Sequence, residues 1–514
     1  MQVKGSHKMS KFNTTNTMKT TNKSGYVAFS MTDKEHLVTA VLTTMFGEPK
    51  YYGNNDNELV HLATNCAKDD PDFLARLACY ARNEANLRSV SHVLACIIAH
   101  DAPEYTRTVL RNVVVRPDDI LEIFACFKAM YQMNPTNAMK RETAELMKKF
   151  DEYQFAKYNS TKKDFTFKDV LRITHPKPDT ADIDELFSKI KNGTLETPYT
   201  WETELSAKGN TAEVWNELIA SGRVGYMALL RNLRNIVKSG ANVYPVLKTL
   251  SDPEQVKKSR QLPFRFFNAY AMLNDAGYMT TDIRNALEKA IRVSVDNMEK
   301  IPGRTLIAVD VSGSMGSRIS RKSVTTCRDI SVLLGVLANK ICESSTVCYF
   351  SYEGDYGYGR SGRYEKTGFE IAKYDEYDSV LDACEQAPGC GGGTDMHLPM
   401  KYALNDDNGT KPFDRVIYLS DNECNCAFTG NGGYGYYYSG REKTVQSEVE
   451  EYRRKFNKDF WVHGVDLQGY GTQQFCGDKF NLIAGWNDNV LEFILTAERG
   501  IDTLVNHIAN YEFK

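Results

Sequence analysis

The fold of the last part of this 514-residue chain is decided by the stretch LIAVDVSGS, residues 306–314. Its four leading apolar residues predict a buried strand. Asp310, Ser312 and Ser314 follow at alternate positions, and the glycine between the serines permits a tight turn that points their oxygens toward one spot. Oxygen ligands of this kind suit Mg²⁺ or Mn²⁺ better than zinc. The stretch therefore predicts a strand that carries a metal-binding loop to the edge of a sheet.

Two later segments supply further oxygen atoms. The run GGGTD, residues 391–395, places Thr394 in a glycine-rich loop that can approach another backbone closely. The run VIYLSD, residues 416–421, is a second apolar run, and it ends in Asp421. Two strand ends and one loop thus offer five oxygen-bearing side chains. On this pattern alone the competing interpretation, ordinary turn residues of an α/β domain, stays open.

The order of these signatures resembles the metal-ion-dependent adhesion site of a von Willebrand factor A domain. The resemblance implies that Mg²⁺ or Mn²⁺ is held by Asp310, Ser312, Ser314, Thr394 and Asp421. It also implies one free coordination position, which would accept an acidic side chain of a protein partner. The sequence therefore predicts a site for binding rather than for chemistry.

The chain changes character at residues 301–303, after which strands and helices alternate. We expect strands at about 305–311, 347–352, 369–373, 415–420 and 460–465, and helices at about 320–341, 396–404, 443–456 and from residue 490 onward. This alternation predicts an α/β doubly wound sheet. Ligands of such folds bind beyond the carboxyl ends of the strands, which is where Asp310 and Asp421 fall.

Residues 33–300 form a succession of amphipathic segments separated by short breaks with Pro, Gly, Asn or Asp. Apolar residues recur at helical spacing in 73–81 and in 120–127. Pro117 is well placed for the first turn of a helix. Helices in this rhythm predict a solenoid-like stack of helical pairs, although the sequence contains no repeat of fixed period.

Charge and cysteine usage bound the class of protein. Lys and Arg outnumber Asp and Glu by 5 in residues 1–300, whereas the acids are in excess by 8 in the remainder, which suggests different partners for the two halves. Twelve cysteines occur without a CxxC pair, and they favour reduced, buried thiols over zinc ligands. The sequence has neither a leader nor an apolar run long enough to span a bilayer, so we expect a cytoplasmic protein.

Two helical segments ahead of the sheet region carry a second resemblance. One includes FTFKDVLRITHPKP at residues 165–178, and the other is WNELI at 215–219 followed by VGYMALLRNLRNI at 224–236. With an A domain after them, they resemble the TROVE family, which contains the Ro autoantigen and its bacterial Ro-like relatives. The resemblance implies a ring of HEAT-like helical repeats over residues 26–300, closed by a von Willebrand A domain over 301–514. The polar first 25 residues are expected to form a mobile arm.

The TROVE resemblance implies a ring-shaped RNA-binding scaffold that is not an enzyme. Small structured noncoding RNA of the Y RNA type is expected on the outer face, and single-stranded ends of misfolded RNA in the central hole. Such a protein would act in RNA quality control or processing. An exoribonuclease is a candidate for the partner that supplies a carboxylate to the metal, and we expect a monomer without membrane contact.

The candidate RNA-binding residues are basic. Residues 139–177 carry ten Lys or Arg against six acids, and such a stripe neutralises phosphates while interleaved rings stack on bases. By resemblance we assign Lys157 and His175; charge and spacing add Lys140, Arg141, Lys168, Arg172, Arg231 and Arg234. Arg172 precedes His175 by three residues, which predicts a shared helical face. A solvated helix face without RNA is the open alternative for all of these positions.

Two other classes of function stay open. A protein-only adhesion or assembly module would use the helical repeats as a peptide-binding solenoid. A metal-dependent hydrolase is disfavoured, because the motif contains no His or Lys as general base, and His397 and His463 are expected to be structural. Two Gly/Tyr-rich loops, 352–364 and 429–438, are expected either to form adaptable contact surfaces or to be variable loops.

Overall fold

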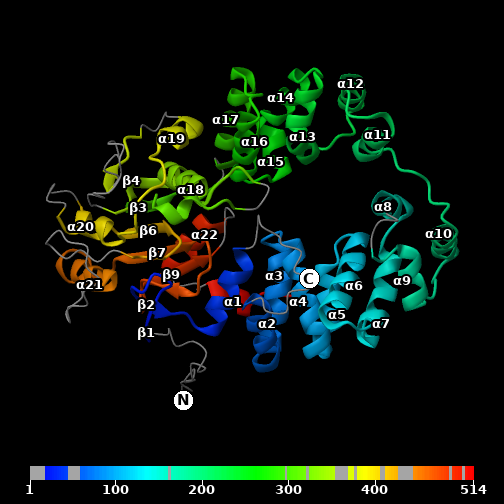
Figure 1. Cartoon of the computed structure of the whole chain (residues 1–514), viewed down its shortest axis with the longest axis horizontal. Coiled ribbons are helices and arrows are strands. Elements are labelled where there is room, and N and C mark those ends of the chain that lie inside the picture. The colour runs from blue at the N-terminus through cyan, green and yellow to red at the C-terminus, as the bar shows by residue number, and fades with distance from the viewer. Residues whose placement is uncertain are drawn as a thin grey trace, which may run out of the picture.

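The computed structural model of the chain describes residues 18–43, 58–159, 164–295, 298–319, 323–352, 368–374, 379–405, 411–425, 444–484, 489–499 and 504–514. Figure 1 shows two parts: a curved array of helices, the helical array, and an α/β part with a central sheet, the sheet domain. The array leaves the sheet domain at one side and returns to it at the other, so the chain follows a closed circuit.

The helical array contains short helices in close succession. Its α-helices are α1 (Asp33–Leu42), α2 (Glu58–Asp69), α3 (Pro71–Asn83), α4 (Arg88–Asp101), α5 (Thr106–Val113), α6 (Pro117–Tyr131), α7 (Asn137–Leu146), α8 (Glu152–Tyr158), α9 (Phe167–Thr174), α10 (Ala181–Asn192), α11 (Trp201–Lys208), α12 (Ala212–Ala220), α13 (Tyr226–Ser239), α14 (Tyr244–Leu250), α15 (Pro253–Ser259), α16 (Pro263–Asp275) and α17 (Thr281–Val295). Helix α3 packs on α4 and α5, α4 on α6, and α5 on α7. This stacking of successive helices is the solenoid that the sequence predicts.

Local sequence signals set the helix starts. Thr166 precedes α9 and accepts a hydrogen bond from the Asp169 amide, while the Asp169 carboxylate accepts one from the Thr166 amide, which forms a capping box. Pro117 is the first residue of α6, as predicted, and Pro263 is the first of α16. Caps of this kind satisfy amides that have no partner within the helix.

The sheet domain contains a six-stranded sheet of order β5-β4-β3-β6-β7-β9. Its elements are β3 (Ile301–Asp310), α18 (Cys327–Ile341), β4 (Cys342–Phe350), β5 (Phe369–Ile371), α19 (Val380–Gln386), α20 (His397–Asn405), β6 (Arg415–Ser420), α21 (Val445–Lys455), β7 (Trp461–Asp466), β9 (Phe480–Ala484), α22 (Asn489–Glu498) and α23 (Leu504–Ala509). Only the β4–β5 pairing is antiparallel among the pairings of this sheet in the described residues.

Both faces of this sheet are covered by helices. Ile307 and Val309 pack in the core that contains α18, whereas Leu306 and Ala308 pack in a second core with residues of α20 and α21. Side chains alternate between the faces of a strand, so the continuous apolar run is explained by burial on both sides. The predicted doubly wound α/β architecture is confirmed. Helix α18 starts at Cys327, seven residues later than predicted, because Thr326 caps it.

The N-terminal boundaries differ from those predicted. Strand β1 (Lys19–Thr21) pairs with β2 (Val27–Ser30), which pairs with β8 (Thr472–Gln473) of the sheet domain. The predicted mobile arm, residues 1–25, is therefore too long, because β1 lies within it. The predicted helical domain, from residue 26, starts with strand β2. Residues 18–32 lack helical periodicity, and their docking partner lies more than 400 residues away, so local patterns could not locate them.

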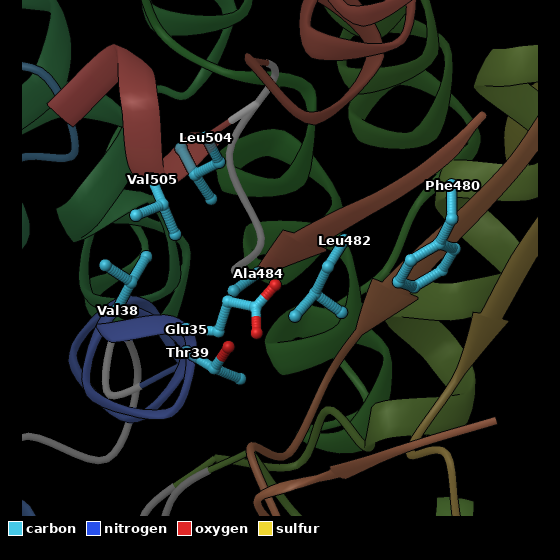
Figure 2. A pocket seen from close by; sticks show the side chains of 8 residues that line it. All are labelled: Glu35, Val38, Thr39, Phe480, Leu482, Ala484, Leu504 and Val505. Atoms are coloured by element: carbon cyan, nitrogen blue, oxygen red, sulfur yellow. The ribbon is translucent and has the colours of Figure 1, made fainter. Parts of the chain in front are cut away.

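Each end of the described chain packs against the other part of the molecule: the N-terminal residues contact the sheet domain, and the C-terminal residues contact α3 of the helical array. This junction is here called the exchanged seam. Asn22 Nδ2 donates a 2.7 Å hydrogen bond to the Cys424 carbonyl of the sheet domain. In the opposite direction, Arg76 of α3 donates to the Tyr511 carbonyl, and its guanidinium lies 4.9 Å from the Phe513 ring centroid. A small pocket of about 60 Å³ remains at this seam. Figure 2 shows its walls, formed by α1, β9 and α23: Glu35, Val38, Thr39, Phe480, Leu482, Ala484, Leu504 and Val505.

The other junction between the two parts is polar. The Glu288 carboxylate of α17 accepts hydrogen bonds from the amides of Val380 and Leu381 at 2.9 and 3.0 Å, at the first turn of α19. Arg284 of the same helix pairs with Asp382. A carboxylate at a helix start satisfies free amides and is favoured by the helix dipole. Ring closure thus combines an exchanged seam at one end with an ionic junction at the other.

Within the described part of the chain, every helix is too short or too polar to span a lipid bilayer. Nine of the eleven described cysteines are buried, which confirms the prediction of mostly buried thiols. The Gly/Tyr-rich loops lie outside the described residues, apart from Tyr352.

Candidate functional site

The predicted metal ligands come from adjacent strands of the sheet. Strand β3 ends at Asp310, and Asp421 directly follows β6, its parallel neighbour. The carboxyl ends of both strands therefore meet at the same sheet edge. Asp310 is fully buried. Its Oδ1 accepts a hydrogen bond of 2.8 Å from the Ser312 amide, and its Oδ2 accepts one of 2.6 Å from the Ser420 hydroxyl. These bonds hold the carboxylate in one orientation.

The two serines of the loop lie together beside these carboxylates. Ser312 Oγ and Ser314 Oγ are 3.2 Å apart. Asp421 Oδ1 accepts a hydrogen bond from the Glu423 amide at 3.2 Å, whereas its buried Oδ2 has no hydrogen-bond partner among the described residues. A buried carboxylate oxygen without a donor is costly unless a cation meets it.

The glycine-rich loop brings the fifth residue to the site. Gly313 donates its amide to the Gly392 carbonyl at 3.0 Å, and a Cβ at position 313 would lie 3.2 Å from that oxygen. This close approach explains the glycine between the two serines. Thr394 follows in the same loop, is buried, and donates its amide to Asn425 Oδ1 at 2.8 Å. The structure therefore brings all five predicted ligands to one end of the sheet.

The electrostatics of this edge favour a cation. Burial, together with the charge of Asp421, raises the pKa of Asp310 to about 7. Burial likewise raises the pKa of Asp421. Two buried carboxylates repel each other when both are ionised, and a divalent cation between them removes that cost. The donor set, two carboxylates and three hydroxyls, suits a hard cation such as Mg²⁺.

Another buried carboxylate at this edge, Asp466, is not among the residues predicted from the sequence. Asp466 ends β7, the strand next to β6, and its Oδ1 accepts from the amides of Gln468 and Gly469 at 2.9 and 2.8 Å. Burial raises its pKa to about 6, and the charge of Asp421 contributes to that rise. The available signal was an apolar run that ends in Asp, the same signal that located Asp421.

The described residues contain no group of three or more His, Cys, Asp or Glu side chains arranged to hold a metal ion. The five predicted ligands include only two residues of those types. Any cation at this edge would therefore depend on the hydroxyls of Ser312, Ser314 and Thr394.

The two lone histidines of the sheet domain have structural partners. His397 lies between the Tyr26 hydroxyl, at 2.7 Å, and the Glu448 carboxylate, at 2.9 Å, and it is buried. His463 is buried against Glu498 at 2.9 Å. Both are tied into the packing of the domain, as predicted for structural histidines.

The predicted RNA-binding residues fall into two separate groups. Lys140 and Arg141 lie on α7, Lys157 on α8, and Lys168 and Arg172 on α9, with His175 just after it. Helix α7 contacts α9, and the rings of Phe155 on α8 and Phe167 on α9 lie 4.9 Å apart, so these positions belong to one region, here called the α7–α9 surface. Arg231 and Arg234 lie on α13, on the other side of the circuit (Figure 1).

The shared helical face predicted for Arg172 and His175 is wrong. Helix α9 ends at Thr174, and His175 has a left-handed backbone with φ of 48° as the residue that terminates the helix. Its exposed side chain therefore leaves the helix in a different direction from that of Arg172. The Pro176 that follows His175 was a usable signal for this helix end.

Several cations of the α7–α9 surface are not neutralised. Lys148 is paired with Glu145 and Asp179, and Arg172 lies 3.9 Å from Asp169. By contrast, no carboxylate of the described chain forms an ion pair with Lys140, Arg141, Lys157 or Lys168. Next to Lys157, the Tyr158 ring is held by Arg116, whose guanidinium lies 4.8 Å from its centroid. Cations without counter-charges, beside a positioned ring, are available to phosphates and bases.

Comparisons with known proteins place this geometry in context. A sequence model of the TROVE domain matches residues 1–193 and 184–281, more than half of the chain, and a model of the Ro60 vWA domain matches residues 304–430. Telomerase protein component 1 of Rattus norvegicus is 26% identical over 40% of this chain and 11% of that protein. RNA-binding protein RO60 of Caenorhabditis elegans is 27% identical over 42% of this chain and 32% of that protein.

These matches span well under half the length of either curated relative. The crystal structure of the Deinococcus radiodurans RO (RSR) protein covers 92% of this chain and 100% of its own, with a TM-score of 0.61 and 17% sequence identity. At that identity the likeness concerns the fold, and it confirms the predicted combination of a helical-repeat ring with an A domain.

Proposed function

We propose that this chain, which belongs to the TROVE-domain family, binds RNA through its helical array. The α7–α9 surface is the proposed platform for a small structured noncoding RNA of the Y RNA type. Single-stranded ends of misfolded RNA would enter the ring. The protein would act as a monomeric cytoplasmic scaffold in RNA quality control or processing and carry out no reaction on the RNA itself.

One observation carries this proposal: Lys140, Arg141, Lys157 and Lys168 are free of ion pairs with the described residues, in a chain whose relative carries the name RNA-binding protein. Most arginines in the neighbouring helices are paired, for example Arg82 and Arg88 with Asp119. Unpaired cations in one region attract phosphates at a lower desolvation cost than paired ones, because no existing ion pair has to be broken.

The sheet edge has a second proposed role, docking a protein partner through a divalent cation. Asp310 and Asp421 would bind Mg²⁺ or Mn²⁺ directly or through water, and Ser312, Ser314 and Thr394 would complete the set. The cation would supply one open position for an acidic side chain. The orphaned Oδ2 of Asp421 supports this fit. A partner of this kind would be a protein acting on the same RNA, such as an exoribonuclease.

Electrophoretic mobility shift with a small structured RNA tests the RNA proposal. We expect binding that weakens as salt rises, and that weakens further in Lys157→Ala and His175→Ala. Lys148→Ala is the matched control, because its ammonium is already paired with two carboxylates. Absent or salt-independent binding would contradict the proposal and favour a protein-only adhesion module, which also predicts purified protein free of nucleic acid.

A further inference from the structure

The β1–β2 hairpin packs against the sheet domain with a tight turn (Figure 1). Asn22 begins the turn and is buried. Its Oδ1 accepts a hydrogen bond of 2.8 Å from the Tyr26 amide, and its carbonyl accepts one of 3.0 Å from the amide of Gly25, which has a left-handed backbone. An asparagine that bonds its own turn in this way is fixed in one orientation. Its Nδ2 group is left to bond outside the hairpin.

The Nδ2 group of Asn22 bonds the segment that follows Asp421. It donates a hydrogen bond of 2.7 Å to the Cys424 carbonyl. The residue before Cys424 is Glu423, whose amide donates to Asp421 Oδ1 at 3.2 Å. The amide that orients the Asp421 carboxylate is thus one residue away from the carbonyl that Asn22 holds. A shift of this segment would turn the carboxylate away from its present direction.

On the other side of Cys424, the same segment is joined to the glycine-rich loop. Asn425 Oδ1 accepts a hydrogen bond of 2.8 Å from the Thr394 amide, and the Asn425 amide donates one of 3.0 Å to the Thr394 carbonyl. The backbone of Thr394 is therefore fixed on both sides by Asn425. Residues 423–425 thus orient two of the five predicted ligands, and Asn22 holds the middle residue of the three.

Two more side chains of the hairpin contact this edge. The amide and the hydroxyl of Ser24 both donate to Glu423 Oε2, at 3.2 and 3.3 Å. The Tyr26 hydroxyl lies 2.7 Å from Nε2 of His397, the first residue of α20, which is three residues after Thr394. The hairpin therefore contacts both loops that supply ligands. The three side chains are here called the hairpin clamp: Asn22, Ser24 and Tyr26.

We propose that the hairpin clamp positions Asp421 and Thr394 for a divalent cation, with Asn22 as the principal positioning residue. This inference rests on the second proposed role of the sheet edge, cation binding. Contacts that orient the ligands of a metal are worth roughly 10 to 100-fold in metal affinity. The clamp acts one contact further out, through residues 423–425, so its effect should be smaller. Residues near the start of the chain would thereby set the affinity of a site near its end.

The test is isothermal titration of Mn²⁺ into the full chain, at a temperature well below its melting temperature. In Asn22→Ala we expect the Mn²⁺ affinity to fall roughly 5-fold, as for the loss of one hydrogen bond. Asn22→Asp keeps the acceptor for the Tyr26 amide and loses the donor to the Cys424 carbonyl. Its added negative charge would by itself raise the affinity for a cation, so a fall in this variant identifies the lost contact as the cause.

Two further variants control the interpretation. Ser30→Ala removes a hydroxyl that donates to the Met18 carbonyl at 3.3 Å within the same hairpin, and it should leave the Mn²⁺ affinity unchanged. Tyr26→Phe keeps the ring in the core, loses the contact with His397, and should lower the affinity roughly 2-fold. The melting temperature of each variant in chelator separates a loss of stability from a loss of affinity. Where the Asn22 variants fail to fold, Tyr26→Phe carries the test.

The outcomes separate the clamp from the cation site itself. Mn²⁺ binding by the wild type with unchanged affinity in Asn22→Ala and Tyr26→Phe overturns the clamp and leaves the cation site standing. An equal loss in Ser30→Ala also overturns it, because the hairpin would then act only through stability. If the wild type binds no Mn²⁺, the proposed cation site fails, and amide hydrogen exchange of residues 391–395 and 421–425 decides the clamp. Faster exchange in Asn22→Ala than in Ser30→Ala supports it, and equal exchange overturns it.

Discussion

The sheet edge and the α7–α9 surface are both candidate binding sites, yet they are built in opposite ways. At the edge, Asp310 and Thr394 are buried, the Asp310 carboxylate accepts a hydrogen bond from the Ser312 amide, and the Thr394 amide donates one to Asn425 Oδ1. On the helical surface, Lys168 and Arg172 are exposed and held by few partners. A preorganised, dehydrated site selects one ion by its geometry, whereas an exposed set of cations binds a polyanion by summed charge. The two sites should therefore respond to different perturbations.

The largest expected effect is the loss of the proposed cation site without loss of RNA binding. Asp310→Asn removes one of two carboxylate charges and should weaken Mn²⁺ binding by more than roughly 100-fold, since changes even to outer contacts cost 10 to 100-fold. Isothermal titration of Mn²⁺ and mobility shift of RNA on the same preparation measure both sites. If Asp310→Asn lost RNA binding together with Mn²⁺ binding, the two sites would be coupled, which contradicts the independence expected here.

The reverse experiment removes the cations of the helical surface. The quadruple variant Lys140→Gln/Arg141→Gln/Lys157→Gln/Lys168→Gln should weaken structured RNA binding by at least roughly 10-fold and lower the salt slope by about 3. Mn²⁺ affinity should stay at the wild-type value. An unchanged slope would assign these residues to a solvated helix face, the alternative that the sequence left open.

The pH dependence of stability sharpens the contrast. Among the described residues, five buried carboxylates with a raised pKa lie in the sheet domain and none lies on the α7–α9 surface: Asp310, Asp395, Asp421, Glu423 and Asp466. Asp310 has a folded pKa of about 7 against an unfolded value near 3.9. Its contribution to stability is therefore complete below about pH 4 and is lost as the pH rises to 7, at up to about 1.4 kcal/mol per pH unit. We expect the melting temperature in chelator to fall over this window, with a smaller fall in Mg²⁺.

Asp310→Asn is the control for that measurement. Its melting temperature in chelator should depend less on pH than that of the wild type, and Asp395, Asp421, Glu423 and Asp466, whose pKa values are also raised by burial, contribute to the remaining dependence. A wild-type profile that is identical with and without Mg²⁺ would argue against a cation at this edge.

The smallest expected effect comes from a paired lysine beside the unpaired ones. Lys148→Gln should change RNA affinity by less than about 2-fold, because exposed ion pairs already satisfy its charge. A loss as large as that of Lys157→Gln would show that pairing does not determine which cations contact RNA. Mobility shifts of the two variants at one salt concentration make this comparison.

Most of the candidate ligands at the sheet edge could be predicted from the sequence, because the carboxyl ends of neighbouring parallel strands lie at the same edge of a sheet. Asp310 and Asp421 end apolar runs, and parallel neighbours align those ends. Asp466 carries the same signal but required knowledge that β7 lies beside β6. Sequence periodicity could predict the α7–α9 helices and their charges. It could not predict which lysines are paired, since Asp179 meets Lys148 from 31 residues away.

Other features depended on contacts that sequence patterns do not encode. The sequence predicts a mobile arm where β1 lies. Its strand depends on pairing with β2, which in turn pairs with the distant β8, and local sequence patterns do not encode that pairing.

The exchanged seam has a consequence for how the chain reaches its native state. The hydrogen bond between Arg76 and Tyr511 joins residues 435 positions apart, and that between Asn22 and Cys424 joins residues 402 apart. Contacts between neighbouring helices can form early, because they close short loops, whereas contacts this distant in sequence form slowly. The array should therefore acquire helical structure before the circuit closes, and the intermediate would expose α1 and α3. Refolding should show a fast helical phase followed by a slow phase in which the seam forms.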